Sequence, residues 1–143
     1  YELCIRHLPH ITPPFAEPAD LAVMIEIAAG SDADASVGND GSLPVTTQLE
    51  VILGTAFEAG WVSDAVVARS ASQRANMWAM REDVLSAMVA HGKWVMNDIS
   101  FQVADLPAAI ADLDAAFAAV APGVYGTAFG HMGDGNLHSC ARP

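Results

Sequence analysis

The feature that most constrains the fold is a glycine-rich run near the C-terminal end, residues 130–138 (GHMGDGNLH). Asp134 and Gly135 favour a two-residue turn of type I′, because both central positions of that turn have positive φ and this pair tolerates it. Such a turn would pair His131 directly with His138 across two antiparallel strands. Directly opposed residues have Cβ atoms roughly 4.5–5.5 Å apart. The run therefore predicts two imidazoles that are close enough to bind one divalent ion.

The charge balance of the chain narrows the partners that it can have. The 143 residues include 6 Lys and Arg against 17 Asp and Glu, a formal net charge of −11. No basic cluster is available to follow a phosphate backbone, so nucleic acid is a poor partner. An anionic substrate would need a local cation as its anchor. No run approaches the roughly 18–20 apolar residues of a membrane span, so we expect no transmembrane segment.

Length and cysteine content point to part of an intracellular protein. The length is most simply that of one domain. Because the chain begins at Tyr1 rather than Met and stops soon after His138, we expect it to be a piece of a larger protein. Cys4 and Cys140 are too few and too far apart for a disulfide scaffold. They predict reduced thiols in a cytoplasmic protein, either free in the cytosol or peripheral to a membrane.

Hydrophobic periodicity predicts alternating strands and helices after a Pro-rich segment at residues 1–20. Strands are expected at 21–28, 62–69, 94–103 and 124–130. Helices are expected to begin after Thr46 or Thr47, after Ser70 and after Asp105, and to end at Gly60, Gly92 and Pro122-Gly123. Two βαβ units linked by a helix fit an α+β sandwich in which helices cover one face of a sheet. A parallel, doubly wound sheet is an alternative that the residues alone leave open.

Each candidate residue of the glycine-rich run has a plain structural alternative. Two histidines are more often surface or structural residues than ligands, and a metal site needs at least three protein ligands. Cys140 is a conceivable third ligand, because it follows His138 by two residues on the same strand face. Gly133 and Gly135 suit a tight hairpin, although they would also let a flat cofactor approach the backbone closely.

Arg81 is the best candidate for an anion anchor. It borders the apolar face of the helix predicted to run from Ser70 to His91. A guanidinium group can hold a carboxylate through two parallel hydrogen bonds. A solvated arginine that pairs with Glu82 or Asp83 is the alternative.

Two further motifs accompany the glycine-rich run: residues 78–82 (WAMRE), and residues 97–100 (NDIS), a polar stretch inside an otherwise apolar strand. In this order and spacing, the three motifs resemble the C-terminal domain of FAD-linked oxidases of the D-lactate dehydrogenase, D-2-hydroxyglutarate dehydrogenase and glycolate oxidase type. The resemblance implies that residues 21–143 form a ferredoxin-like α+β sandwich, with an antiparallel sheet of about four strands covered by helices. This domain would close over an FAD that is bound mainly by a separate FAD-binding domain.

The resemblance also implies roles for individual residues. His131 and His138 would bind a divalent metal such as Zn or Mn and take part in catalysis. Arg81 would bind the substrate carboxylate, and Asn136 would contact the substrate as well. The glycines at 133 and 135 would lie against the cofactor. A third metal ligand, a glutamate, is expected beyond the last residue of the chain.

Three positions depart from the D-2-hydroxyglutarate enzymes, in which a hydroxyl residue, a lysine and an asparagine assist binding. This chain has Leu85, Met96 and Cys140 there. We therefore expect the full-length protein to oxidise a small D-2-hydroxy acid, lactate- or glycolate-like, to the 2-oxo acid, and the isolated chain to be inactive. The alternative is a stand-alone ferredoxin-like ligand-binding module without redox activity. A metal-dependent hydrolase would need a further carboxylate ligand.

Overall fold

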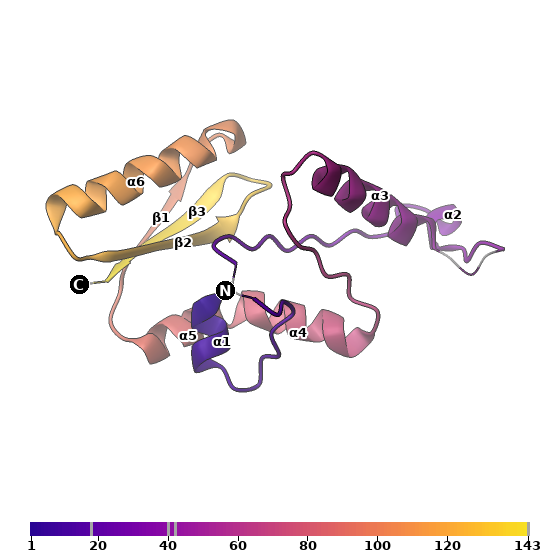
Figure 1. The fold of residues 1–143 in the computed structure, drawn as a ribbon, viewed down its shortest axis with the longest axis horizontal. Helices are drawn as coiled ribbons and strands as arrows, with labels where there is room; N and C mark the ends of the chain where they lie inside the picture. Colours follow the sequence, from indigo (N-terminus) through magenta and orange to yellow (C-terminus); the bar gives the residue numbers. More distant parts are fainter. Residues whose placement is uncertain (18, 40, 42, 143) are drawn as a thin grey trace. The chain divides into compact units, whose positions relative to one another are not determined.

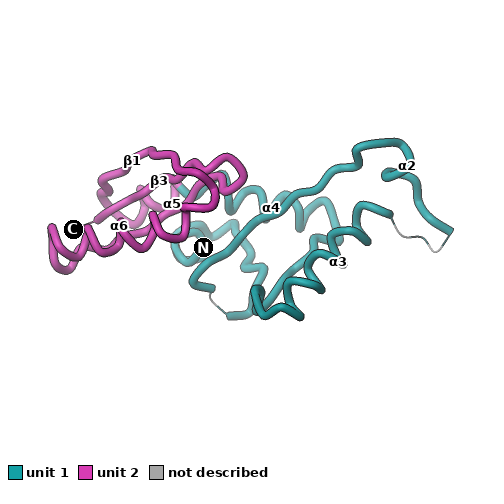
Figure 2. The backbone as a smooth tube through the Cα atoms, turned by 90° about the horizontal axis from the view of Figure 1, so that it is seen from above, with its two compact units in different colours: residues 1–84 teal, residues 85–143 magenta. Residues whose placement is uncertain are grey.

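The computed structural model describes residues 1–17, 19–39, 41 and 43–142, which form two compact units, residues 1–84 and 85–143 (Figure 2). The boundary falls where a single long helix was predicted. Instead, α4 (Ala71–Glu82) and α5 (Val84–His91) are separate helices with Asp83 between them. Asp83 has φ −87° and ψ 7°, outside the helical region. The prediction of one helix was wrong here, since apolar periodicity continues through a break at a residue of low helix propensity.

The regular secondary structure described in the first unit is helical. Besides α4 it contains α1 (Glu2–His7), α2 (Asp32–Ala35) and α3 (Pro44–Glu58). At the end of α3, the Gly60 N–H donates to the Phe57 carbonyl and the Trp61 N–H donates to the Ala56 carbonyl. Gly60 has φ +72°, so this end is a Schellman motif, and the predicted stop is confirmed.

Ser70 caps α4 as predicted. Its hydroxyl oxygen accepts from the Gln73 N–H at 3.2 Å. The reciprocal bond of a capping box is displaced by one residue, because the Gln73 amide oxygen accepts from the N–H of Arg69 at 2.7 Å. The start of this helix is therefore specified locally, by side chains within five residues of one another.

The strands predicted at 21–28 and 62–69 are not formed. Both stretches run as extended chain without a ladder of backbone hydrogen bonds. The alternating apolar side chains of the first stretch, Leu21, Val23 and Ile25, are exposed. A period of two places side chains on alternate faces, but it supplies no partner strand, and this part of the prediction was wrong.

The second unit contains an antiparallel sheet of three strands, β1 (Val95–Ser100), β2 (Tyr125–His131) and β3 (Asn136–Arg142), in the order β1-β3-β2 (Figure 1). A 3₁₀ turn, η1 (Val103–Asp105), leads from β1 into α6 (Leu106–Val120), the helix predicted to follow Asp105. The α+β class and the antiparallel sheet are confirmed and are compatible with a ferredoxin-like sandwich, whereas the described strands number three rather than four.

Helix α6 lies along one face of this sheet (Figure 1). A Cβ atom added at Gly126 of β2 would lie 3.0 Å from the ring of Phe117 on α6. Near the end of α5, Trp94 packs edge-on against Tyr125, with ring centroids 5.8 Å apart. Tyr125 points to the opposite face from Gly126, because adjacent residues of a strand alternate. None of the helices in the described ranges is long and apolar enough to span a lipid bilayer.

Candidate functional site

The glycine-rich run forms the predicted hairpin, but with a different register. Its loop has four residues, 132–135, and His131 pairs with Asn136. His138 pairs with Phe129 instead of His131. The prediction of a two-residue turn with directly opposed histidines was therefore wrong.

The conformation of Asp134 explains the longer loop. A type I′ turn needs positive φ at both central residues, whereas only Gly135, at φ +76°, has it. The Asp134 carboxylate accepts from the Asn136 N–H at 3.0 Å, and the Asp134 N–H donates to the His131 carbonyl at 3.3 Å. The Phe101 N–H donates to the Gly135 carbonyl at 3.0 Å. A tertiary contact with the chain that follows β1 thus holds the loop.

The register change keeps both histidines on the same face of the sheet. A shift of two residues preserves the face, whereas a shift of one would have reversed it. His131 and His138 become diagonal neighbours on adjacent strands, a relation in which Cα atoms lie roughly 7–8 Å apart and long side chains still reach each other. His131 is exposed, and His138 is half-buried.

His138 lies on the central strand, between side chains of both neighbouring strands. On β1, its cross-strand partner is Asp98, whose Oδ1 lies 3.4 Å from His138 Nδ1. On β2, its partner is Phe129, with ring centroids 4.9 Å apart. The same Asp98 oxygen accepts a hydrogen bond from Asn136 Nδ2 at 2.6 Å. His138, Asp98, Asn136 and Phe129 therefore form one cluster, which we call the His138 cluster.

Sequence reasoning had not assigned a site role to Asp98 or Phe129. The polar stretch at 97–100 stands out in an otherwise apolar strand, and alternation leaves Asp98 and Ser100 on one face of it. What the sequence lacks is the register between β1 and β3. Only that register places Asp98 opposite His138.

The described residues do not support the divalent metal that was predicted at His131 and His138. Asp98 Oδ1 lies 3.4 Å from His138 Nδ1 as an ion-pair contact, without a hydrogen bond between them. Together with His131, the chain offers two imidazoles on one face. Across the described ranges, no three or more His, Cys, Asp or Glu side chains are placed to hold an ion together.

Cys140 is not a third ligand. Its side chain is fully buried, and burial raises the pKa of its thiol. Among the described residues, Cys140 belongs to no group of three or more side chains that could hold a metal ion. The Cys140 Sγ lies 3.8 Å from the carbonyl oxygen of His138 as a weak hydrogen-bond donor. The prediction that Cys140 is a third metal ligand is therefore wrong.

The two glycines of the loop differ in their surroundings. A Cβ atom on Gly133 would meet no atom within 4 Å. A Cβ atom on Gly135 would overlap the carbonyl oxygen of Phe101. Gly135 is therefore required by turn geometry and packing, while the space around Gly133 admits the close approach of another group. A contact of either with a cofactor stays a prediction.

Arg81 belongs to the first unit, where it lies half-buried in the last turn of α4. Of the two acidic neighbours that were considered as its partners, Asp83 pairs with His10, whose Nε2 lies 2.9 Å from Asp83 Oδ2. The role of Arg81 as a carboxylate anchor for the site at the histidines stays a prediction.

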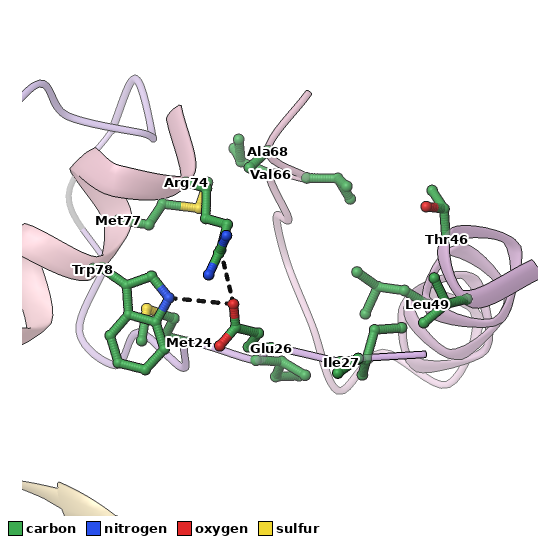
Figure 3. Close-up of a pocket in the computed structure, with 14 residues that line it drawn as sticks. Met24, Glu26, Ile27, Thr46, Leu49, Val66, Ala68, Arg74, Met77 and Trp78 are labelled. Carbon is green, nitrogen blue, oxygen red and sulfur yellow. Dashed lines mark hydrogen bonds and ion pairs between the residues drawn. The ribbon is translucent and has the colours of Figure 1, made fainter. Parts of the chain in front are cut away.

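The first unit also contains a hollow of about 440 Å³, between α3, α4 and the two extended stretches (Figure 3). Glu26 projects into it, and its Oε1 accepts from Arg74 Nε at 2.8 Å and from Trp78 Nε1 at 3.4 Å. None of the predicted site residues lines this hollow. The ion pair neutralises its one guanidinium group, so the hollow offers no net charge to an anionic ligand.

Comparison with known proteins assigns the family. The sequence profile for FAD linked oxidases, C-terminal domain, matches residues 15–141. The chain belongs to this family. The family membership inferred from the three motifs is thereby confirmed, and it associates the chain with FAD.

The curated relatives are longer proteins. A D-2-hydroxyglutarate dehydrogenase from Xanthomonas citri pv. viticola is 34% identical over 125 residues, covering 87% of this chain and 24% of the relative. The mitochondrial D-2-hydroxyglutarate dehydrogenase from Arabidopsis thaliana is 31% identical over 137 residues, covering 96% and 22%. A D-2-hydroxyglutarate dehydrogenase from Stutzerimonas stutzeri is 41% identical over 81 residues, covering 57% and 17%. The chain thus spans at most about a quarter of the length of these relatives.

Proposed function

We propose that the full-length protein is an FAD-dependent dehydrogenase that oxidises a 2-hydroxy acid to the 2-oxo acid, and that this chain supplies its substrate-binding side. The observation that carries the proposal is the family match over residues 15–141, which includes all three motifs. The His138 cluster supports it, because it gathers imidazole, carboxylate and amide groups on one face of a sheet.

In this proposal the chain binds and orients the substrate. Arg81 holds the carboxylate through a bidentate pair, and Asn136 contacts the substrate from the edge of the His138 cluster. His131 and His138 would hold a divalent metal such as Zn or Mn, and one of the two histidines, where the metal leaves it unbound, or a neighbouring group would accept the hydroxyl proton. The chemistry that the bound groups would supply is a lower pKa of the substrate hydroxyl from the metal and a hydride acceptor from the flavin. The backbone at Gly133 offers space for a flat group.

We further propose that the substrate is a small acid with one carboxylate. Met96 and Cys140 are a cross-strand pair on the face that carries Asp98 and His138. Neither side chain can pair with a second carboxylate, and Leu85 is equally apolar. The second candidate is D-2-hydroxyglutarate, which is favoured by the names of the relatives.

Flavin reduction in the full-length protein tests these proposals. The purified protein is mixed anaerobically with D-lactate, glycolate or D-2-hydroxyglutarate, and the flavin absorbance is recorded. We expect bleaching by one of the two small acids. Bleaching by D-2-hydroxyglutarate alone would establish the second candidate. A flavin that none of a panel of 2-hydroxy acids bleaches would instead favour the ligand-binding module without redox activity.

Replacement of Arg81 tests the anchor. Lysine keeps the charge but loses the two parallel hydrogen bonds, so Arg81→Lys should raise KM by about 10- to 100-fold. Arg69→Lys in the same unit is the matched control, because Arg69 pairs only at the surface with Glu50, at 3.0 Å. Equal KM values for the two variants would remove Arg81 from the site.

A further inference from the structure

We propose that Asp98 is a positioning residue, which turns the side-chain amide of Asn136 so that the amide oxygen, Oδ1, accepts the hydrogen bond of the substrate hydroxyl. The inference rests on the proposed function, in which Asn136 contacts a 2-hydroxy acid. It adds to that function a residue and a direction of hydrogen bonding. It also predicts that the site prefers the hydroxy acid to the 2-oxo acid that the reaction forms.

The backbone of Asn136 is held from both sides. Asn136 is the first residue of β3, the central strand, and its Cα partners are Ser100 on β1 and His131 on β2. Its N–H donates to the Asp134 carboxylate at 3.0 Å. With the main chain fixed in this way, the direction of the amide group depends on the rotation of the side chain.

Asp98 fixes that rotation. Asn136 Nδ2 donates to Asp98 Oδ1 at 2.6 Å, which is short for an N–H···O hydrogen bond and fits a charged acceptor. The two residues meet because Asp98 is the direct partner of His138, which follows Asn136 by two residues on the same face of β3. An ionised carboxylate can only accept hydrogen bonds, so the amide must turn its nitrogen toward Asp98. The amide oxygen, on the other side of Cγ, is then turned away from Asp98.

The direction of the amide distinguishes the two acids. The hydroxyl of a 2-hydroxy acid can donate or accept a hydrogen bond, whereas the oxygen at carbon 2 of a 2-oxo acid can only accept. An acceptor at Asn136 Oδ1 therefore suits the substrate and opposes lone pairs to lone pairs in the product. An amide turned the other way would offer Nδ2 to either acid. Loss of the orientation should thus favour the 2-oxo acid more than it harms the hydroxy acid.

Product inhibition of the full-length protein measures this preference. The KM of the acid that bleaches the flavin is compared with the inhibition constant Ki of its 2-oxo product, either D-lactate with pyruvate or D-2-hydroxyglutarate with 2-oxoglutarate. Asp98→Leu removes the acceptor at a similar size, so the amide can turn. We expect Ki to fall by about 5- to 10-fold, the worth of one hydrogen bond, while KM rises by about 2-fold. A general structural loss would weaken the binding of both acids, so a lower Ki marks a change in the direction of the amide.

Two further variants are the controls. Asp98→Asn is neutral, as Asp98→Leu is, but it keeps an oxygen that can accept from Asn136 Nδ2, so it should retain part of the preference. Both variants lose the ion-pair contact of Asp98 with His138 at 3.4 Å, and a difference between them therefore reports on Asn136. Ser100→Ala replaces the direct cross-strand neighbour of Asn136, on the strand and face of Asp98, and should leave KM and Ki unchanged.

The hydrogen bond can also be observed without turnover. The full-length protein is labelled with ¹⁵N in its asparagines, and the side-chain signal of Asn136 is identified by its absence in Asn136→Asp. We expect one Nδ2 proton to be shifted downfield and protected from exchange with solvent, because it is bonded to the carboxylate. Both features should be lost in Asp98→Leu and kept in Ser100→Ala.

The possible outcomes separate this inference from the proposed function. An Asn136 amide that shows neither feature in the unaltered protein would overturn the inference, even where Asp98→Leu fails to fold. A Ki that is unchanged or higher in Asp98→Leu would overturn it as well, and so would equal changes in Asp98→Leu and Asp98→Asn. If no 2-hydroxy acid bleaches the flavin while the amide signal responds as expected, the proposed function fails together with the hydroxyl contact, and the orientation of Asn136 by Asp98 stands.

Discussion

The two units of the chain each contain a stretch that was predicted as a strand, and the two stretches differ in outcome. Residues 21–28 and β1 have similarly exposed side chains, Val23 by 56% and Val95 by 62%. Yet β1 is hydrogen-bonded to β3 along its whole length, whereas residues 21–28 have no ladder. Side-chain exposure therefore does not separate the two stretches. What separates the two stretches is the presence of a neighbouring strand.

Hydrogen exchange should show the largest difference between the units. The amides of β3, a central strand paired on both sides, should exchange at least about 1000-fold more slowly than those of residues 21–28. Peptide-resolved exchange by mass spectrometry on the full-length protein measures both. Equal protection of the two segments would mean that another segment of the full-length protein pairs with residues 21–28. The difference between the two units would then be absent from the full-length protein.

A substitution in the hairpin loop should have the next largest effect, confined to the second unit. Gly135→Ala puts a Cβ on a residue with φ +76° and against the Phe101 carbonyl, which should destabilise the hairpin by about 2–3 kcal/mol. Exchange of the β2 and β3 amides should become faster by about 30- to 150-fold.

Gly133→Ala is the control within the same loop, because Gly133 has open space around it and no positive φ. It should leave exchange nearly unchanged. If the two alanine variants behave alike, the four-residue loop is wrong.

The smallest expected effect is the loss of helix stability when the N-cap residue of α4 in the first unit or of α6 in the second unit is replaced. Ser70→Ala removes a side-chain cap and should destabilise α4 by about 1 kcal/mol. Asp105 occupies the N-cap of α6 without a capping hydrogen bond, so Asp105→Ala should lose only its charge interaction with the helix, about 0.5 kcal/mol. The local opening free energies of both helices, from hydrogen exchange, give the comparison. A larger loss at Asp105 would reverse it.

The sequence predicts best the features that local chemistry specifies. Ser70 at the start of α4 and Gly60 after α3 were identified from residue type, because caps act within a few residues. The hairpin at 130–138 and the family were found in the same way. The break at Asp83 was missed, since apolar spacing continues on both sides of it.

The register of the sheet lay beyond such reasoning. The turn dipeptide favoured a two-residue loop, but the contact of Gly135 with Phe101 and the side-chain bond of Asp134 favour four residues. With the longer loop, the cross-strand partner of His138 is Phe129 rather than His131. Because the register shifts by two residues, both histidines still lie on one face of the sheet.

The sequence by itself determined the residue types of the site, the α+β class and the family, because motifs and periodicity are properties of neighbouring residues. Tertiary structure decided which stretches became strands and which side chains met. Asp98 and His138 are 40 positions apart, and only the hydrogen-bonded pairing of β1 with β3 brings them together. A strand has no internal hydrogen bonds of its own, so its neighbours, and with them the His138 cluster, are chosen by the fold as a whole.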